Sequence, residues 1–221
     1  MAGRVPQFSN QGTAPFFVPV AVPNQGNQAA VTRVGILAMQ GAFVEHAAMI
    51  RRLGAEAVLV RLPRDLEKVD ALILPGGEST TIGKLMRAYG LLEAISHAAG
   101  IGVPIFGTCA GMILLAKEVA GQAQPHLGLM DIVVKRNALG RQIDSFETDL
   151  QISGLDPRPF HAVFIRAPIV EKVGEDVAIL ASLPDGTVAA AREGNLLVSS
   201  FHPELTDDPR LHEYFLRMAG R

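Results

Sequence analysis

The chain has 221 residues, of which 48% are hydrophobic, and a formal net charge of −2 with both signs mixed along its length. That size and apolar content suffice for one α/β domain with a large core, and the near-neutral charge argues against a nucleic-acid-binding stripe or a polybasic membrane patch. The single cysteine excludes internal disulfides and a cysteine-rich zinc site, and it fits a reducing, cytoplasmic location.

Residues 1–30 differ in composition from the rest of the chain. Arg4 is their only charged residue, and prolines interrupt the apolar patch around Phe16 and Phe17. A secretory signal would need a basic start and an unbroken apolar stretch. We therefore expect residues 1–30 to be a disordered extension, an overlong start or a cloning remnant, with a partner-binding segment as the alternative. Residues 31–221 are expected to form a single domain.

The first half of the chain alternates short apolar runs with amphipathic stretches at helical spacing. The run at 71–74 is wholly apolar, which is typical of a buried strand in a parallel sheet. A helix that Ser79 or Thr80 can cap is expected to follow it and to end at Tyr89. The other expected elements are strands at 33–39, 56–60 and 103–106, helices at 42–53, 91–99 and 112–119, and a helical turn at 65–69.

The second half is richer in strands, separated by turns that carry Gly, Pro and Asp. We expect strands at 129–135, 148–152, 162–166, 178–182, 188–192 and 196–201, and a closing helix at 208–218. This order predicts an α/β fold with an open, mostly parallel, flavodoxin-like sheet flanked by helices. An antiparallel, strand-rich segment is expected in the second half.

The strongest chemical signal is the turn Gly107-Thr108-Cys109-Ala110-Gly111, between an apolar run and a helical stretch. It is the cysteine counterpart of the G-x-S-x-G nucleophile elbow, in which a Cβ at either glycine would clash. The position of Cys109 at a helix N-terminus favours the thiolate. The N–H of Ala110 is free to face a developing oxyanion. A buried, inert cysteine is the alternative.

A second signal, Phe201-His202-Pro203-Glu204, follows the last apolar strand. A cysteine nucleophile needs a base, and the base needs an orienting carboxylate. His202 and Glu204 are of the right type and lie at the sheet edge where such sites assemble. Pro203 breaks the regular alternation of a strand, so the sequence leaves contact between the two side chains open.

Other motifs give weaker evidence about function. The stretch Gly76–Lys84 suggests a phosphate-binding loop, but Glu78 replaces the first required glycine and Leu85 the required Ser or Thr. The glycine pair in this stretch could instead complete an oxyanion hole. We interpret the remaining histidines as structural or solvated, with the Glu45-His46 pair on a helix surface, and expect no metal site. These histidines are His46, His97, His126, His161 and His212.

With these residues in place, the sequence resembles the class I (triad) glutamine amidotransferases, and among them the glutaminase subunits of pyridoxal 5′-phosphate synthases. The elbow and His202-Pro203-Glu204 mark only the broad superfamily. More specific are the blocks P-G-G-E-S-T-T, R-Q-x-D-S-F and F-I-R-A-P, and the likeness covers about residues 33–218. The matching segments are 35–41, 74–81, 106–112, 136–137, 140–146, 164–168 and 200–204.

The resemblance implies a reaction and a set of roles. Cys109 would attack the side-chain amide of L-glutamine, His202 would act as base and then acid, and Glu204 would orient His202. The backbone N–H groups of Gly77 and Ala110 would form the oxyanion hole. Glutamine would be held by Gly77, Glu78, Ser79, Arg136, Ile165 and Arg166. A guanidinium grips an α-carboxylate well, which agrees with the two arginine roles.

The resemblance also implies a partner, a (βα)8-barrel synthase subunit that receives the ammonia through a channel for vitamin B6 biosynthesis. Pyridoxal phosphate would be the product of the complex, and the glutaminase itself would need no cofactor. Three alternatives remain: a DJ-1-like cysteine protein, an inactive amidotransferase that only scaffolds its partner, and a flavodoxin-type flavin binder. The loop after the first strand lacks the Ser and Thr residues that the last would need.

Overall fold

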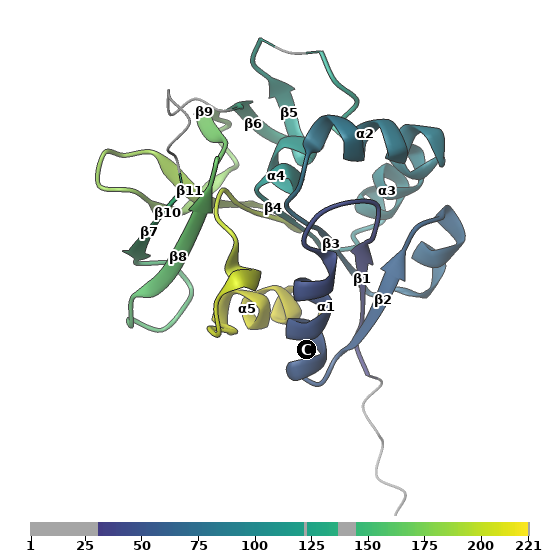
Figure 1. Ribbon diagram of the computed structural model, residues 1–221, viewed down its shortest axis with the longest axis horizontal. Coiled ribbons are helices and arrows are strands. Elements are labelled where there is room, and N and C mark those ends of the chain that lie inside the picture. Colours follow the sequence, from purple (N-terminus) through teal and green to yellow (C-terminus); the bar gives the residue numbers. More distant parts are fainter. Residues whose placement is uncertain (1–30, 122, 137–144, 221) are drawn as a thin grey trace, which may run out of the picture. The chain divides into compact units, whose positions relative to one another are not determined.

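Strands from both halves of the chain pair in one central sheet (Figure 1). The computed structural model describes residues 31–121, 123–136 and 145–220. The predictions for residues 1–30, and the motif residues 137–144, lie outside this range. The part of the chain from Val31 onward forms one compact unit, and the proposed domain boundaries stay a prediction.

The strands are short, as the spacing of turn residues predicted. They are β1 (Arg33–Leu37), β2 (Glu56–Val60), β3 (Ala71–Leu74), β4 (Ile105–Thr108), β5 (Ala116–Val119), β6 (Met130–Lys135), β7 (Ser145–Leu150), β8 (Phe160–Ile165), β9 (Ile169–Val173), β10 (Ala178–Ser182), β11 (Val188–Glu193) and β12 (Leu196–Ser199). The α-helices are α1 (Phe43–Arg52), α2 (Ser79–Ala88), α3 (Leu91–Gly100), α4 (Ala110–Leu115) and α5 (Arg210–Met218), and the 3-10 helices are η1 (Pro63–Lys68) and η2 (Pro203–Leu205).

The main sheet has the strand order β2-β1-β3-β4-β12-β11-β9-β6-β5, with β10 beside β11. The first five strands in this order are parallel to one another. From β12 onward, the pairs of β11 with β12, β10 and β9, and of β6 with β9, are antiparallel. The hairpin of β7 and β8 forms a separate two-stranded sheet. The predicted class, a mostly parallel sheet with a later antiparallel segment, is confirmed.

Alternate residues of the central strands pack into two separate cores. In β3, Leu72 and Leu74 pack with α2, α3 and α4, whereas Ile73 packs with α1 and α5. Figure 1 shows α2 and α3 on one side of the sheet and α1 and α5 on the other. This two-sided burial explains why β3 is wholly apolar. The carboxyl ends of β3, β4 and β12 meet at one edge, where the predicted site residues follow.

The helix predicted at residues 112–119 is wrong in its second half. α4 begins at Ala110 and ends at Leu115, and the next four residues form β5, which pairs with β6. Ala116, Lys117 and Glu118 are good helix formers, but pairing at the sheet edge overrides this weak local preference. The sequence also missed β9, which follows Pro168 and has three exposed residues in a row at its end. Within the described residues, no helix is both long and apolar enough to cross a membrane.

Candidate active site

Cys109 lies on the sharp turn between β4 and α4. Its φ of 48° is in the left-handed region, which is uncommon for a residue with a side chain. A Cβ at Gly107 would lie 2.6 Å from the carbonyl of Gly111, and a Cβ at Gly111 would overlap the carbonyl oxygen of Leu74. Both glycines are therefore required by close backbone packing, as the elbow motif predicted. Because Ala110 is the first residue of α4, its N–H has no acceptor within that helix.

His202 and Glu204 follow the neighbouring strand β12. The N–H of His202 donates to the Val163 carbonyl of β8 at 2.8 Å, which fixes the backbone of the histidine. Pro203 begins η2, and this turn brings Glu204 back toward the imidazole. The distance between His202 Nδ1 and Glu204 Oε1 is 2.8 Å. The contact that the sequence left open is therefore made, because the chain leaves the strand conformation at Pro203.

The surroundings of His202 favour the protonated, charged form of its imidazole. Burial disfavours the charge, but hydrogen bonds with Cys109 and Glu204 outweigh it and raise the pKa of His202 to about 10. Glu204 is also buried, which alone would raise its pKa. His46 and His202 favour the ionised carboxylate, so the pKa of Glu204 is lowered instead. The arrangement holds an imidazolium between the thiol and a buried carboxylate.

The loop after β3 lies against the loop after β1. The N–H of Glu78 donates to Gln40 Oε1 at 2.7 Å, and the N–H of Ala42 donates to the Gly76 carbonyl at 3.1 Å. A Cβ at Gly77 would lie 2.6 Å from Gln40 Oε1. Gly77 and Gly41, where a Cβ would overlap the Gly76 carbonyl oxygen, therefore allow the close approach of the two loops. This approach brings the backbone of Gly77 to the edge of the pocket that contains Cys109.

Helix α2 is capped by Glu78, so the prediction of Ser79 or Thr80 as the cap is wrong. The carboxylate of Glu78 accepts from the N–H of Thr80 at 3.1 Å and from that of Thr81 at 2.7 Å. Burial raises the pKa of Glu78, but the hydrogen bonds from Thr81 and Thr80 outweigh burial and lower the pKa to about 2. Glu78 thus accepts from the N–H groups two and three residues after it, the usual contacts of an N-cap side chain.

Arg136 is held by side chains of this same region. Its guanidinium donates to Glu78 Oε1 at 3.0 Å, to Thr80 Oγ1 at 2.7 Å and to Gln124 Oε1 at 2.9 Å. On the opposite side, Arg166 has a φ of 45° and follows Ile165, whose carbonyl lies 3.9 Å from the Cys109 sulfur. Two cationic side chains and one ionised carboxylate thus surround the thiol.

One pocket of about 270 Å³ collects these residues. Every residue predicted for catalysis or glutamine binding lines it, except Ala110 in the turn and Glu204 behind His202. Gln40 and Ile113 also line the pocket, and neither was predicted from the sequence as a site residue. Gln40 could have been found from its place in the turn after the first strand. The lining residues are Gln40, Gly77, Glu78, Ser79, Cys109, Ile113, Arg136, Ile165, Arg166 and His202.

His46 was also missed, and its expected position on a helix surface is wrong. It is fully buried in α1, and its Nε2 atom lies 3.3 Å from Glu204 Oε2. A helical projection would have indicated this, because His46 shares a face with Met49 and Ile50, three and four residues later. Its partner Glu204 could not be inferred from that pattern.

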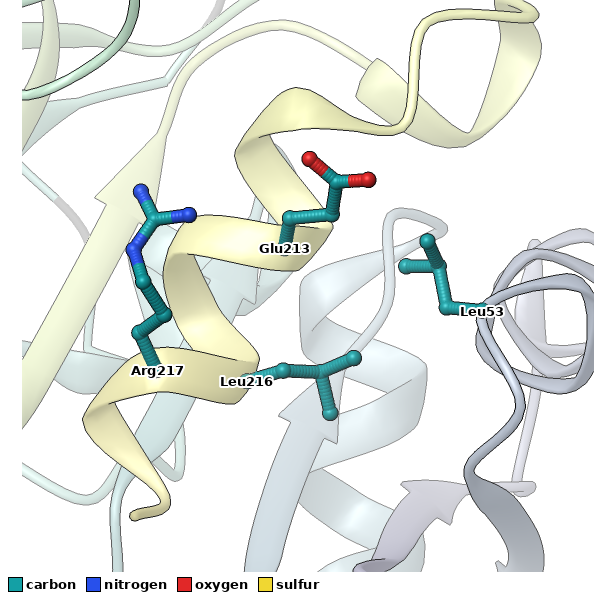
Figure 2. Close-up of a pocket in the computed structure, with 4 residues that line it drawn as sticks. All are labelled: Leu53, Glu213, Leu216 and Arg217. Carbon is teal, nitrogen blue, oxygen red and sulfur yellow. The ribbon is translucent and has the colours of Figure 1, made fainter. Parts of the chain in front are cut away.

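A second hollow of about 300 Å³ lies between α5 and the end of α1. Leu53, Glu213, Leu216 and Arg217 line it, and Figure 2 shows the two leucines pointing toward each other across it. It contains no nucleophile or base paired as in the Cys109 pocket. Among the described residues, no group of three or more His, Cys, Asp or Glu side chains is placed to hold a metal ion.

Comparisons with known proteins bear on the family and the fold of the chain. Residues 36–221 match the model of the SNO glutamine amidotransferase family. The chain is 61% identical over 186 residues to a protein of Herpetosiphon aurantiacus named pyridoxal 5′-phosphate synthase subunit PdxT, which covers 83% of this chain and 98% of the relative. A protein of Dehalococcoides mccartyi with the same name is 58% identical over 189 residues, covering 85% and 97%.

Solved structures give the same result for the fold. A crystal structure described as a glutamine amidotransferase superposes with a TM-score of 0.81 at 53% identity, over 85% of this chain and 99% of the other. The structure of PurLQS from Thermotoga maritima superposes with a TM-score of 0.64 at 19% identity, over 85% and 98%. At that identity the second match bears on the fold alone.

Proposed function

The chain belongs to the SNO glutamine amidotransferase family, and from this premise we propose that it is the glutaminase subunit of a pyridoxal 5′-phosphate synthase. The family predicted from the sequence is confirmed, and a DJ-1-like protein or a flavin binder has no support. The reaction is hydrolysis of L-glutamine to L-glutamate and ammonia. The observation that carries the residue roles is the pairing of His202 with Glu204 at 2.8 Å beside Cys109.

In the proposed mechanism, Cys109 attacks the side-chain amide carbon of glutamine as a thiolate. The negative charge that develops on the amide oxygen is stabilised by the backbone N–H groups of Gly77 and Ala110. His202, charged before the attack, transfers its proton to the leaving nitrogen, and ammonia departs. His202 then takes a proton from water, which hydrolyses the thioester and releases glutamate. Glu204 keeps the imidazole oriented throughout.

The charges of the pocket match a zwitterionic amino acid. We propose that Arg136 and Arg166 bind the α-carboxylate, because guanidinium groups form paired hydrogen bonds with carboxylates. Glu78 stays ionised at neutral pH, which suits an α-ammonium group. Ser79 and the Ile165 backbone complete the predicted binding set, and both line the same pocket.

The proposed partner is the synthase subunit of the complex, the (βα)8 barrel that the resemblance implied. Ammonia is mostly protonated at neutral pH and then cannot act as a nucleophile, so a sheltered transfer from one subunit to the other has a chemical reason. The proposal includes a cytoplasmic location, since the single cysteine must stay reduced to react.

The test is release of glutamate from glutamine by the full chain, measured alone and with the barrel subunit. We expect release with the barrel and none from the Cys109→Ala variant. A glutamine analogue carrying an electrophile should label Cys109 in the wild type and nothing in that variant. Binding of the barrel without glutamate release or labelling would overturn the proposal and favour an inactive scaffold.

A further inference from the structure

A polar cluster that the mechanism does not use lies behind the triad. His46 of α1, His212 of α5 and Thr108 of β4 are all fully buried, and the Glu204 carboxylate is fully buried beside them. Polar groups are costly to bury unless they are paired. Four such groups from four separate elements therefore call for a specific arrangement of protons.

The contacts fix which nitrogen of His46 carries the proton. Burial, as the largest cause, lowers the pKa of His46 and lowers that of His212 to about 3, so both rings are neutral and each has one N–H. His212 Nε2 lies 2.9 Å from His46 Nδ1. Across the described residues His212 Nδ1 has no hydrogen-bond partner, so its proton is better placed on Nε2, where it donates to His46. The proton of His46 is then on Nε2.

That N–H lies near two acceptors, the hydroxyl of Thr108 and the carboxylate of Glu204. His46 Nε2 is 3.3 Å from Glu204 Oε2, the oxygen that faces away from His202. Within the described part of the chain this oxygen makes no hydrogen bond of good geometry. A buried carboxylate oxygen without a donor is strongly destabilised. The nearby Nε2–H of His46 has hydrogen-bond geometry toward Thr108 Oγ1. Catalytic hydrogen bonds often tighten only in the substrate complex, and a small rotation of the ring would turn the same N–H to Glu204 Oε2.

The same nitrogen reaches the other two parts of the site through Thr108. His46 Nε2 lies 3.1 Å from Thr108 Oγ1, and that oxygen accepts from the N–H of Gly76 at 3.0 Å. Thr108 directly precedes Cys109, and Gly76 directly precedes the Gly77 N–H of the proposed oxyanion hole. His46 therefore lies next to Glu204 and to Thr108, and through Thr108 it is linked to the residues that precede Cys109 and Gly77.

We propose that His46 is a positioning residue of the glutaminase, donating its Nε2–H to the outer oxygen of Glu204 so that this carboxylate stays ionised and aligned with His202. This inference rests on the proposed function. It matters most when His202 has given its proton to the leaving nitrogen. At that point the buried carboxylate has lost its cationic partner, and it keeps only neutral donors: the Nδ1–H of His202 and a backbone N–H on the near side, and the proposed His46 N–H on the outer oxygen.

The proposal predicts opposite behaviour for two amides of different length. In Gln, the amide nitrogen lies at the ε position and can replace the Nε2–H of His46 toward Glu204. In Asn, it lies at the δ position, so it can face His212 but cannot reach Glu204. The charged and titratable groups that act on this cluster are Glu45, His46, Arg52, Cys109, His202, Glu204 and His212.

The experiment measures kcat and KM for glutamate release over a range of pH, in the complex with the barrel. We expect His46→Asn to lower kcat about 10- to 100-fold, with little change in KM because His46 does not line the pocket. The acidic limb of its kcat profile should move to higher pH, since loss of the donor raises the pKa of Glu204 and catalysis needs the carboxylate ionised. His46→Gln should restore most of the rate and the original profile.

A buried residue on the same helix gives the matched control. Ile50→Ala removes apolar packing from the same face of α1 and leaves every polar group of the cluster in place, so it should lower the unfolding temperature and leave the kcat profile unmoved. Equal rates for His46→Asn and the wild type, or a loss in both amide variants with an unshifted profile, would overturn the positioning role. Failure of the proposed function would be distinguished by absence of release from the wild type itself.

Discussion

The elbow packs its backbone directly against β3, and Gly111→Ala tests this contact. A Cβ at Gly111 would overlap the carbonyl oxygen of Leu74 and lie 2.8 Å from its carbonyl carbon. Real Cβ atoms essentially never come within 3.0 Å of such atoms. The obstacle is backbone, which cannot rotate away, so α4 and β3 must separate by on the order of 1 Å.

This separation should have a small effect on stability and a large effect on the rate of glutamate release. Overpacking of a core costs about 1–3 kcal/mol, and replacing a helical glycine by alanine returns about 1 kcal/mol, so we expect a net loss of up to roughly 2 kcal/mol in the free energy of unfolding. Cys109 lies two residues before Gly111, and the glycine loop follows Leu74. A displacement of about 1 Å between nucleophile and oxyanion donors should lower glutamate release about 100-fold.

Urea unfolding with linear extrapolation gives the first quantity, and glutamate release with the barrel gives the second. Gly100→Ala is the control, because a Cβ there would have nothing within 4 Å and the same chemical change should be neutral or slightly stabilising. If both variants unfold at the same urea concentration and release glutamate at the same rate, the argument from backbone contact is refuted.

Three further predictions follow from single contacts. In Gly76→Ala, the new Cβ would lie 2.9 Å from His202 Nδ1, so glutamate release should fall about 100-fold while urea unfolding changes by under about 1 kcal/mol; an unchanged rate would contradict the contact. In Cys109→Ser, the pKa of the His202 ring, followed by NMR, should fall below its wild-type value of about 10, because the hydrogen bond with the cysteine sulfur that raises it is lost. An unchanged pKa would mean that Glu204 alone raises it. Glu78→Gln should cost about 1 kcal/mol at pH 7 through the helix cap. Since the pKa of Glu78 is lowered from 4.5 to about 2, that difference from the wild type should shrink as the pH falls through this window in acid unfolding curves, and a constant difference would argue against the cap.

The elbow was predictable because its constraints are local. Gly107 and Gly111 stand two residues on either side of Cys109, and each is required by atoms of the same turn or of an adjacent strand. A strand-to-helix reversal with a nucleophile at its tip permits few sequences, so the spacing alone indicated the geometry. The expected clash of a Cβ at either glycine is confirmed.

Predictions from local conformational preference were wrong where the same residues could adopt more than one structure. Ala116, Lys117 and Glu118 favour a helix in isolation, yet they form a strand because β6 is available as a neighbour. The cap of α2 was assigned to Ser79 or Thr80, the usual types, although Glu78 performs it. In both cases the deciding partner lies outside the window from which the preference was read.

The carboxylate of Glu204 makes one contact that the local sequence suggested and one that depends on distant parts of the chain. Its contact with His202 depends on the single residue between them, Pro203, and the sequence could suggest it as one possibility. Its contact with His46 depends on packing of α1 and α5 against the end of β4. There His46 also meets His212, 166 positions later in the sequence. Periodicity can indicate that His46 faces inward, but only the assembled sheet edge determines that it meets the carboxylate of Glu204. Residues that position a site from behind are therefore harder to predict than those that face the substrate, because no motif spacing constrains them.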